Sequence, residues 1–311
     1  MADVSHLRRE TFMRACAAAI LAVLILCLPE PTRAWGLDVH RFITKRAIAG
    51  LPAGLKPFYM ARADFITEHA VDPDMWRLIG LKGDLGDEEP NHFLDIDGLD
   101  DPRPFKNVPR DWNAYVAKYG AERANRTGRV PWRAEEIYKK LVERFQEAAK
   151  NPNGFGAENA AYLSAVISHY IEDAHQPFHA VTSYDGQATN QRGIHARFEN
   201  DLVLRNLPKL KLLPVVTRPV PNVKDFIFEA LISGEALVES ILAADKRAIA
   251  NREFYDAAYY AAFLSGTQPI VERRISEAAS GVASVITQAW TDAGKPVIPA
   301  TRTPAPVRIK R

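Results

Sequence analysis

The stretch from His169 to His179 constrains the fold of this chain more than any other segment. It reads His-Tyr-Ile-Glu-Asp-Ala-His-Gln-Pro-Phe-His and holds three of the eight histidines in the 311-residue chain. His169 and Asp173 are four residues apart, and a helix would place this imidazole and this carboxylate on one face. Imidazole nitrogens and carboxylate oxygens suit zinc and similar divalent ions. The stretch therefore predicts a helix that carries part of a metal site.

A second pair with the same spacing, His195 and Glu199, follows sixteen residues later. A lone histidine is more often a hydrogen-bonded structural residue than a ligand, but two such pairs are hard to explain by packing. The histidines that form a coherent ligand set are His40, His92, His169, His179 and His195. His175 falls two residues after Asp173, off the ligand face of a regular helix, and we expect it to be structural, as we do His69.

Apolar residues recur at three- and four-residue spacing through most of the chain, which predicts helices. Two clear cases are 132–150 and 160–174, and two longer candidates are 223–250 and 254–290. No run of alternating β-branched residues indicates a strand. The segments rich in Gly, Pro, Asn or Asp, where we expect loops, are 82–91, 100–110, 150–156, 183–194 and 206–222. The pattern predicts one all-α, multi-helix domain over residues 35–290.

Residues 1–34 have the composition of a signal peptide. Three arginines precede an apolar run at 17–28, and Ala34 offers a small residue at a cleavage point. The alternative, a membrane anchor, is less favoured because the run is shorter than the roughly 17–25 residues of a membrane span. We therefore predict a cut between Ala34 and Trp35, a secreted or periplasmic protein, and a mature chain without a transmembrane anchor.

The mature chain would have no thiol chemistry, because Cys16 and Cys27 both lie in the predicted signal peptide. Any metal would then be held by nitrogen and oxygen alone. Without residues 1–34, 36 of the 40 basic and 35 of the 38 acidic residues remain. This near balance gives no global basic field for nucleic acid. At the other end, residues 291–311 are rich in proline and basic residues, which predicts a disordered tail.

The combined motif resembles a known superfamily. The motif is His169-x3-Asp173-x-His175-Gln-Pro-x-His179, followed by a His-x3-Glu pair and preceded by Trp-Gly at 35–36. It resembles the zinc-dependent phospholipases C and single-strand-specific nucleases, which are trinuclear zinc phosphodiesterases. The resemblance covers about residues 35–205. It implies the all-α fold of that superfamily, three Zn²⁺ ions, and hydrolysis of phosphoric diesters by metal-activated water.

The resemblance also implies which residues bind each ion. The ligands are His92, His169, Asp173 and an upstream Asp for one ion; the backbone amine and carbonyl of Trp35 with His40 and Asp173 for another; and His179, His195 and Glu199 for the last. A backbone nitrogen can be a ligand only after cleavage frees it as an amine, and the predicted cut before Trp35 would do this. The upstream Asp, which would also position the attacking water, is better matched by Asp74 than by Asp72.

The substrate class depends on weaker signals. Gly193-Ile194-His195-x-x-Phe198-Glu199-Asn200 resembles the bacterial phospholipase C branch, since the nucleases usually have Asp at the position of Glu199. His175-Gln176-Pro177 resembles the nucleases instead. We predict a phospholipase C-like hydrolase, with a single-strand-specific nuclease as the alternative and a non-catalytic secreted zinc-binding protein as the second. A phospholipid substrate would bring transient contact with a membrane surface, whereas a nuclease would bind a nucleic acid. No feature specifies an oligomeric state.

Overall fold

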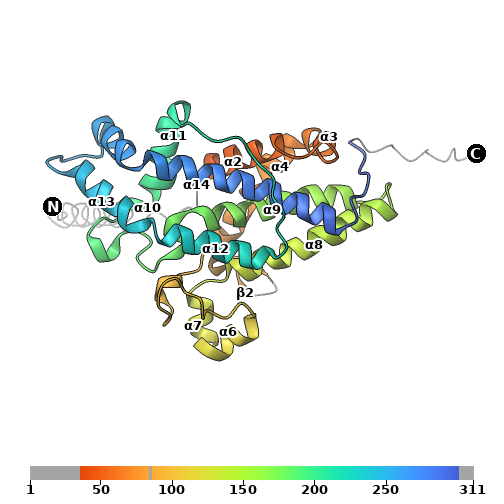
Figure 1. Cartoon of the computed structure of the whole chain (residues 1–311), viewed down its shortest axis with the longest axis horizontal. Coiled ribbons are helices and arrows are strands. Elements are labelled where there is room, and N and C mark those ends of the chain that lie inside the picture. The colour runs from red at the N-terminus through yellow and green to blue at the C-terminus, as the bar shows by residue number, and fades with distance from the viewer. Residues whose placement is uncertain (1–35, 84–85, 301–311) are drawn as a thin grey trace, which may run out of the picture. The chain divides into compact units, whose positions relative to one another are not determined.

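A computed structural model of the chain describes residues 36–83 and 86–300, which belong to one compact unit. The predicted signal peptide, Trp35 and residues 301–311 lie outside the described residues. The described part is mostly helical, so the prediction of an all-α fold is confirmed (Figure 1). Within it, no helix combines the length and the apolar character needed to span a membrane.

Among the described residues, six long helices form most of the fold: α2 (Leu37–Ala49), α8 (Val130–Lys150), α9 (Gly156–His175), α12 (Val223–Glu235), α13 (Val238–Ile249) and α14 (Ala257–Asp292). The shorter α-helices are α3 (Lys56–Met60), α4 (Ala63–His69), α5 (Asp72–Leu78), α6 (Trp112–Tyr119), α7 (Ala121–Arg126), α10 (Ile194–Ala196) and α11 (Leu202–Asn206). Short 3-10 helices are η1 (Glu89–His92), η2 (Ile96–Gly98), η3 (Pro177–Ala180), η4 (Gln187–Thr189) and η6 (Leu207–Lys209), and η5 (Arg197–Asp201) is a π-helix. The strands β1 (Lys82–Gly83) and β2 (Gly86–Asp87) form a minimal antiparallel pair.

Helix α9 lies at the centre of the fold. It packs against α8, α14, α12, α4 and α2, so these helices cover it on several sides (Figure 1). Its first residue, Gly156, allows a close approach to α8, because a Cβ there would lie 2.6 Å from the backbone nitrogen of Ala148. From Ala165 to its last residue, His175, every side chain of α9 is buried. A helix in this position can bring polar side chains together far from water.

Helix α9 ends at His175 for two reasons. Gln176 precedes a proline and adopts extended backbone angles (φ −82°, ψ 119°), which is the conformation favoured before proline. The buried side chain of Arg274, on α14, then donates hydrogen bonds to the carbonyl oxygens of His175 (2.7 Å) and Ala174 (3.4 Å). These bonds satisfy carbonyls that a helix end leaves without partners. The chain can therefore turn sharply into η3.

One of the two long segments predicted to be helical contains a single helix, and the other forms two helices. The segment 254–290 contains one continuous helix, α14, which begins at Ala257 and continues through Pro269 to Asp292. The segment 223–250 is two helices instead, because α12 ends at Glu235 and α13 begins at Val238. α12 packs along α8 and η3, whereas α13 packs along α14, so a straight helix could not reach both.

The packed part of the chain continues into the segment that was predicted to be a disordered tail. Beyond α14, the side chain of Ile298 is buried, and Arg62 donates a hydrogen bond to the carbonyl oxygen of Ala300 (2.7 Å). The packed part of the chain therefore extends to at least residue 300, past the predicted domain end at 290.

An extended strap over residues 210–220 connects η6 to α12 and runs along α14. Its backbone N–H groups donate to polar side chains that recur every four residues on α14. The pairs are Lys211 with Glu272, Leu213 with Ser276, Val216 with Ser280, Arg218 with Ser284 and Val220 with Gln288. One face of a helix thus replaces the partner strand that an extended segment normally needs.

The strap predicts an effect of single hydroxyls on stability. We expect Ser276→Ala and Ser284→Ala each to lower the free energy of unfolding by about 1 kcal/mol, because each removes the acceptor of a strap N–H. Urea denaturation would measure this loss. The exposed Ser265 on the same helix provides the control, and a loss of stability in Ser265→Ala equal to that in the other two variants would contradict the account.

Candidate metal centre

The structure brings together all of the predicted ligands that it describes. Their side chains come from five parts of the chain, and each is buried. They are His40, Asp74, His92, His169, Asp173, His179, His195 and Glu199, with residue exposures between 0% and 5%. Within this set, three groups have ligand atoms that lie within 4.8 Å of one another: His40, Asp74 and His169; His92, His169 and Asp173; and His179, His195 and Glu199. Each group could hold a metal ion.

The two carboxylate oxygens of Asp173 lie close to different pairs of histidines. Its Oδ2 lies 3.0 Å from Nδ1 of His92 and 3.2 Å from Nε2 of His169, one turn back on α9. Its Oδ1 lies 3.5 Å from Nε2 of His40 and 3.8 Å from Nδ1 of His179. The four-residue spacing therefore places His169 and Asp173 on one face, as the sequence predicts. A carboxylate in this position could serve two ions at once.

The structure separates the two candidates for the upstream Asp. Asp74 lies in the first turn of α5 with both carboxylate oxygens buried, and Oδ1 is 3.9 Å from Nδ1 of His92. Asp72 points elsewhere, because its Oδ2 accepts hydrogen bonds from His69 (2.8 Å) and Tyr162 (2.9 Å). Only Asp74 lies among the ligand set.

The third group depends on two unusual local structures. The turn after α9 leads into η3, which returns His179 toward the cluster, with Nδ1 2.7 Å from the carbonyl oxygen of His92. His195 and Glu199 are four residues apart, and the chain passes from α10 into the π-helix η5 between them. Their Nε2 and Oε2 atoms still lie 2.8 Å apart. Single π-helical turns of this kind often occur at functional sites.

Hydrogen bonds outside the cluster fix the orientation of several imidazoles. Nδ1 of His169 lies 2.9 Å from the carbonyl oxygen of Ala70, and Nδ1 of His179 faces the carbonyl of His92 in the same way. Because a carbonyl only accepts, Nδ1 must donate and Nε2 carries the lone pair that a metal needs. The carbonyls thus turn the free nitrogens toward the other ligands.

Two further side chains, which the sequence analysis did not assign to the site, contact predicted ligands. Glu172 lies 2.6 Å from Nδ1 of His40, and Arg77 pairs with Asp74 through Nη2 and Oδ1 at 3.0 Å. Glu172 stands next to the predicted ligand Asp173 in the buried half of α9, and an acidic residue at this position was the available signal for a role in the site.

The ionisation of the site follows from burial and from its neighbours. Burial lowers the pKa of His179 and of His195 to about 4, so both imidazoles are neutral near pH 7. Burial would raise the pKa of Asp173, but the nearby histidines hold it well below its usual range. The pKa of Glu199, in contrast, is raised by burial. Neutral imidazoles next to an ionised carboxylate are the forms that bind a cation.

Several ligand atoms are buried without any hydrogen-bond partner in the described part of the chain. They are Nε2 of His40, both carboxylate oxygens of Asp74, Nε2 of His92, Oδ1 of Asp173, and both ring nitrogens of His195. Buried polar atoms normally have partners, and leaving one without a partner is costly. Nitrogen and oxygen lone pairs converging in this way fit divalent cations, and zinc among them. The residues present therefore fit the metals that the motif implies.

The remaining histidines do not join the cluster. Nδ1 of His175 donates to the carbonyl oxygen of Ile171 (2.7 Å), and its ring lies 5.8 Å from that of Phe226. His69 is partly exposed and pairs with Asp72. Both belong to none of the three groups, as expected for structural residues. The predicted ligand Trp35 lies outside the described residues.

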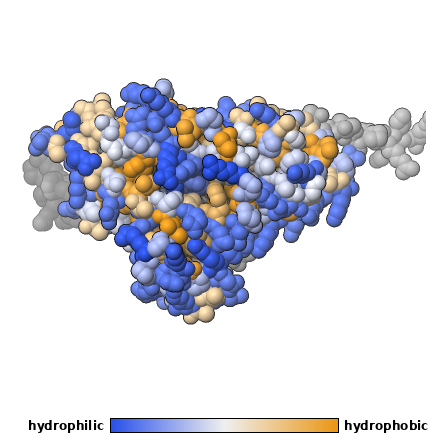
Figure 2. Space-filling model, viewed as in Figure 1, coloured by the Kyte–Doolittle hydropathy of each residue, from blue (hydrophilic) through white to orange (hydrophobic). Residues whose placement is uncertain are grey.

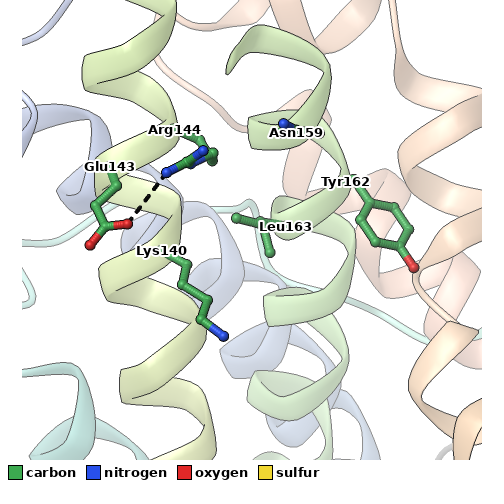
Figure 3. A pocket seen from close by; sticks show the side chains of 6 residues that line it. All are labelled: Lys140, Glu143, Arg144, Asn159, Tyr162 and Leu163. Carbon is green, nitrogen blue, oxygen red and sulfur yellow. Dashed lines mark hydrogen bonds and ion pairs between the residues drawn. The ribbon is translucent and has the colours of Figure 1, made fainter. Parts of the chain in front are cut away.

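The surface offers two hollows away from the cluster. Figure 2 shows a mostly hydrophilic face on which hydrophobic residues form small separate patches. One hollow of about 310 Å³ lies between α8 and α9 and is lined by Lys140, Glu143, Arg144, Asn159, Tyr162 and Leu163 (Figure 3). Another of about 540 Å³ lies beside α3 and α4. Neither is lined by a predicted ligand.

The pKa of one acidic residue close to the site, Asp95, is raised well above its usual value. Asp95 follows the η1 segment of His92, and its backbone N–H donates to the carbonyl oxygen of Thr127 (2.7 Å). Burial, with a smaller contribution from the charge of Asp97, raises the pKa of the Asp95 carboxyl to about 7. The folded protein therefore holds a proton there that the unfolded chain would release above about pH 4.

Comparison with models of known protein families gives no match, and comparison with curated protein sequences gives no significant match.

The separation of Asp74 from Asp72 predicts different effects of the same substitution. We expect Asp74→Asn to reduce bound zinc by about one ion per chain, because an amide is a poor replacement for an ionised ligand. Asp72→Asn, two residues away on the same helix, is the matched control and should retain the zinc content of the unmodified protein. Elemental analysis of the purified proteins would measure this. Equal zinc contents in the two variants would contradict the assignment.

The raised pKa of Asp95 predicts a pH-dependent stability. Between about pH 4 and pH 7 the folded state binds more protons at this carboxyl than the unfolded state, so its contribution to stability falls as the pH rises. Asp95→Asn removes this contribution. We expect the variant to gain stability relative to the unmodified protein between about pH 5 and pH 8, measured by urea denaturation. The same gain in the exposed Asp64→Asn control would argue against this explanation.

Proposed function

We propose that the protein is a secreted zinc-dependent phosphodiesterase, most similar in activity to the phospholipases C. The observation that carries the proposal is the convergence of five imidazoles and three carboxylates on one buried cluster, with the two oxygens of Asp173 facing different neighbours. In the arrangement that the motif implies, Asp173 would bridge two ions and His179, His195 and Glu199 would hold a third, more open one.

The charges of the predicted ligands would leave the occupied site able to attract a phosphodiester. Three carboxylates, from Asp74, Asp173 and Glu199, would offset only part of the charge of three divalent ions. The occupied site would therefore stay positive and attract a phosphate group. Bound zinc ions supply Lewis-acid stabilisation of phosphate oxygens and a lowered pKa for water.

Asp74 and Arg77 are placed to act on the reacting groups. Asp74 is fully buried and forms an ion pair with Arg77, whose Nη2 lies 3.0 Å from Oδ1. Neither carboxylate oxygen of Asp74 has a hydrogen-bond partner among the described residues, so the carboxylate can accept a proton from water. The Arg77 side chain, 12% exposed, gives a permanent positive charge beside it. A guanidinium in this place can pair with a phosphate oxygen as negative charge develops there.

The choice of substrate depends on the residues around the third group. Glu199 in place of Asp favours the phospholipase C branch. The partly exposed ring of Tyr184, 5.9 Å from that of His195, supports both main candidates. An aromatic face can hold a quaternary ammonium head group, and it can also stack with a base, as a single-strand-specific nuclease would require. This ring keeps the nuclease as the alternative function.

Secretion is part of the proposal because it would complete the site. Cleavage before Trp35 would free its backbone amine as a ligand. The precursor could not form the full set of ligands before export, so the activity would appear only outside the cytoplasm.

The proposal predicts hydrolysis that depends on zinc. We expect the purified mature protein to hydrolyse a phosphocholine ester and phosphatidylcholine vesicles, to lose this activity on treatment with a chelator, and to recover it with added zinc. The Asp173→Asn variant should be inactive, and Asp72→Asn should be active. Single-stranded DNA is assayed in parallel.

The outcomes separate the candidate functions. DNA cleavage without lipid hydrolysis would replace the phospholipase with the nuclease. Bound zinc without turnover of any of the three substrates would indicate a non-catalytic zinc-binding protein. Full activity in a sample shown to be free of metal would contradict the proposed chemistry altogether.

A further inference from the structure

Nδ1 of His92 faces the predicted ligand Asp173, whereas three other imidazoles of the cluster have an Nδ1 partner that is not a predicted ligand atom. One of these three partners differs in kind. His169 and His179 face the backbone carbonyls of Ala70 and His92. His40 faces a side chain instead, with Nδ1 2.6 Å from Oε2 of Glu172. A backbone carbonyl is held by the fold, whereas a carboxylate can be removed by substitution. The orientation of His40 is therefore open to a direct test.

The contact between His40 and Glu172 is fully enclosed. Both side chains are 0% exposed, and Oε1 of Glu172 accepts a second hydrogen bond from the hydroxyl of Thr44 at 2.8 Å. Thr44 lies one turn after His40 on α2, so both partners of Glu172 come from the same helix face. Glu172 itself belongs to α9 and stands next to Asp173. The carboxyl group thus connects the two helices that supply His40 and Asp173.

The hydrogen bond decides which nitrogen of His40 is available. Because Nδ1 points at Glu172, Nε2 points in the opposite direction, 3.5 Å from Oδ1 of Asp173, and has no hydrogen-bond partner within the described residues. The imidazole rings of His40 and His169 are stacked, with centroids 4.1 Å apart. A 180° flip of the His40 ring would keep this stacking, so the stacking does not select which nitrogen faces Glu172. The hydrogen bond between Nδ1 and Glu172 holds the ring against a flip that would exchange the two nitrogens.

We propose that Glu172 is a positioning residue, which holds His40 with Nε2 directed at the metal centre and thereby sets the affinity of the ion that His40 binds. The inference rests on the proposed zinc centre and adds a residue outside the set of metal ligands. Partners of this kind orient ligand imidazoles, and their loss typically weakens metal binding about 10- to 100-fold. Glu172 does not touch the substrate.

Two substitutions of similar volume separate positioning from packing. In Glu172→Gln the new amide would still offer an oxygen to Nδ1 of His40, whereas in Glu172→Met the thioether would fill the space without a comparable acceptor. In a titration of the zinc-loaded protein with a chromophoric chelator, we expect Glu172→Met to lose one ion about 10- to 100-fold more readily than the unmodified protein. Glu172→Gln should stay within about tenfold of it. Ser164→Ala, which removes a buried hydroxyl elsewhere on α9, should leave the titration unchanged.

The titration has distinct outcomes. Equal retention of zinc by Glu172→Met and the unmodified protein would overturn the inference. Equal losses in Glu172→Met and Glu172→Gln would also overturn it, since a hydrogen-bond acceptor would then be insufficient. Absence of bound zinc from the unmodified protein would instead refute the metal centre. If Glu172→Met does not fold, Thr44→Val is titrated in its place, and an unchanged chelator curve would count against positioning.

Discussion

Burial of ionisable groups at one point is the constraint on which the rest of the structure depends. Two carboxylates, Asp74 and Asp173, are fully buried, and five imidazoles surround them. Taking an isolated charge out of water is strongly unfavourable, and several of these atoms have no hydrogen-bond partner within the described chain. Divalent cations would compensate this cost. On this account metal binding and the stability of the folded state are linked, as in other proteins whose ligands are buried.

The fold meets this constraint by placing one helix in the centre and supplying the other ligands from its surroundings. α9 provides His169 and Asp173, and its neighbours cover it on several sides. The other ligands come from helix starts, 3-10 turns and a π-helix, where the backbone can deviate from a regular path to aim a side chain. Outside the cluster, backbone carbonyls and Glu172 form hydrogen bonds with the imidazoles, and Arg77 forms an ion pair with Asp74. The precision of the site therefore comes from the layer around the ligands.

Much of this arrangement could be predicted from the sequence, because it depends on local periodicity and on residue type. The helix that carries His169 and Asp173, the turn at Gln176 that returns His179, and the structural role of His175 all follow from spacing and from proline. Other features depend on contacts distant in sequence. The π-helix at Glu199, the division between α12 and α13, and the strap on α14 arise from packing that no local pattern records. Glu172 and Thr44 lie 128 residues apart, and only the folded chain brings them together.

The central claim is that the buried cluster is a zinc centre completed by export. The most direct test is the metal content of the purified mature protein, measured by elemental analysis together with its N-terminal residue. The account predicts about three zinc ions per chain and an N-terminal Trp35, as the resemblance of the motif implies. A folded mature protein that binds no divalent metal, even after incubation with zinc, would contradict it.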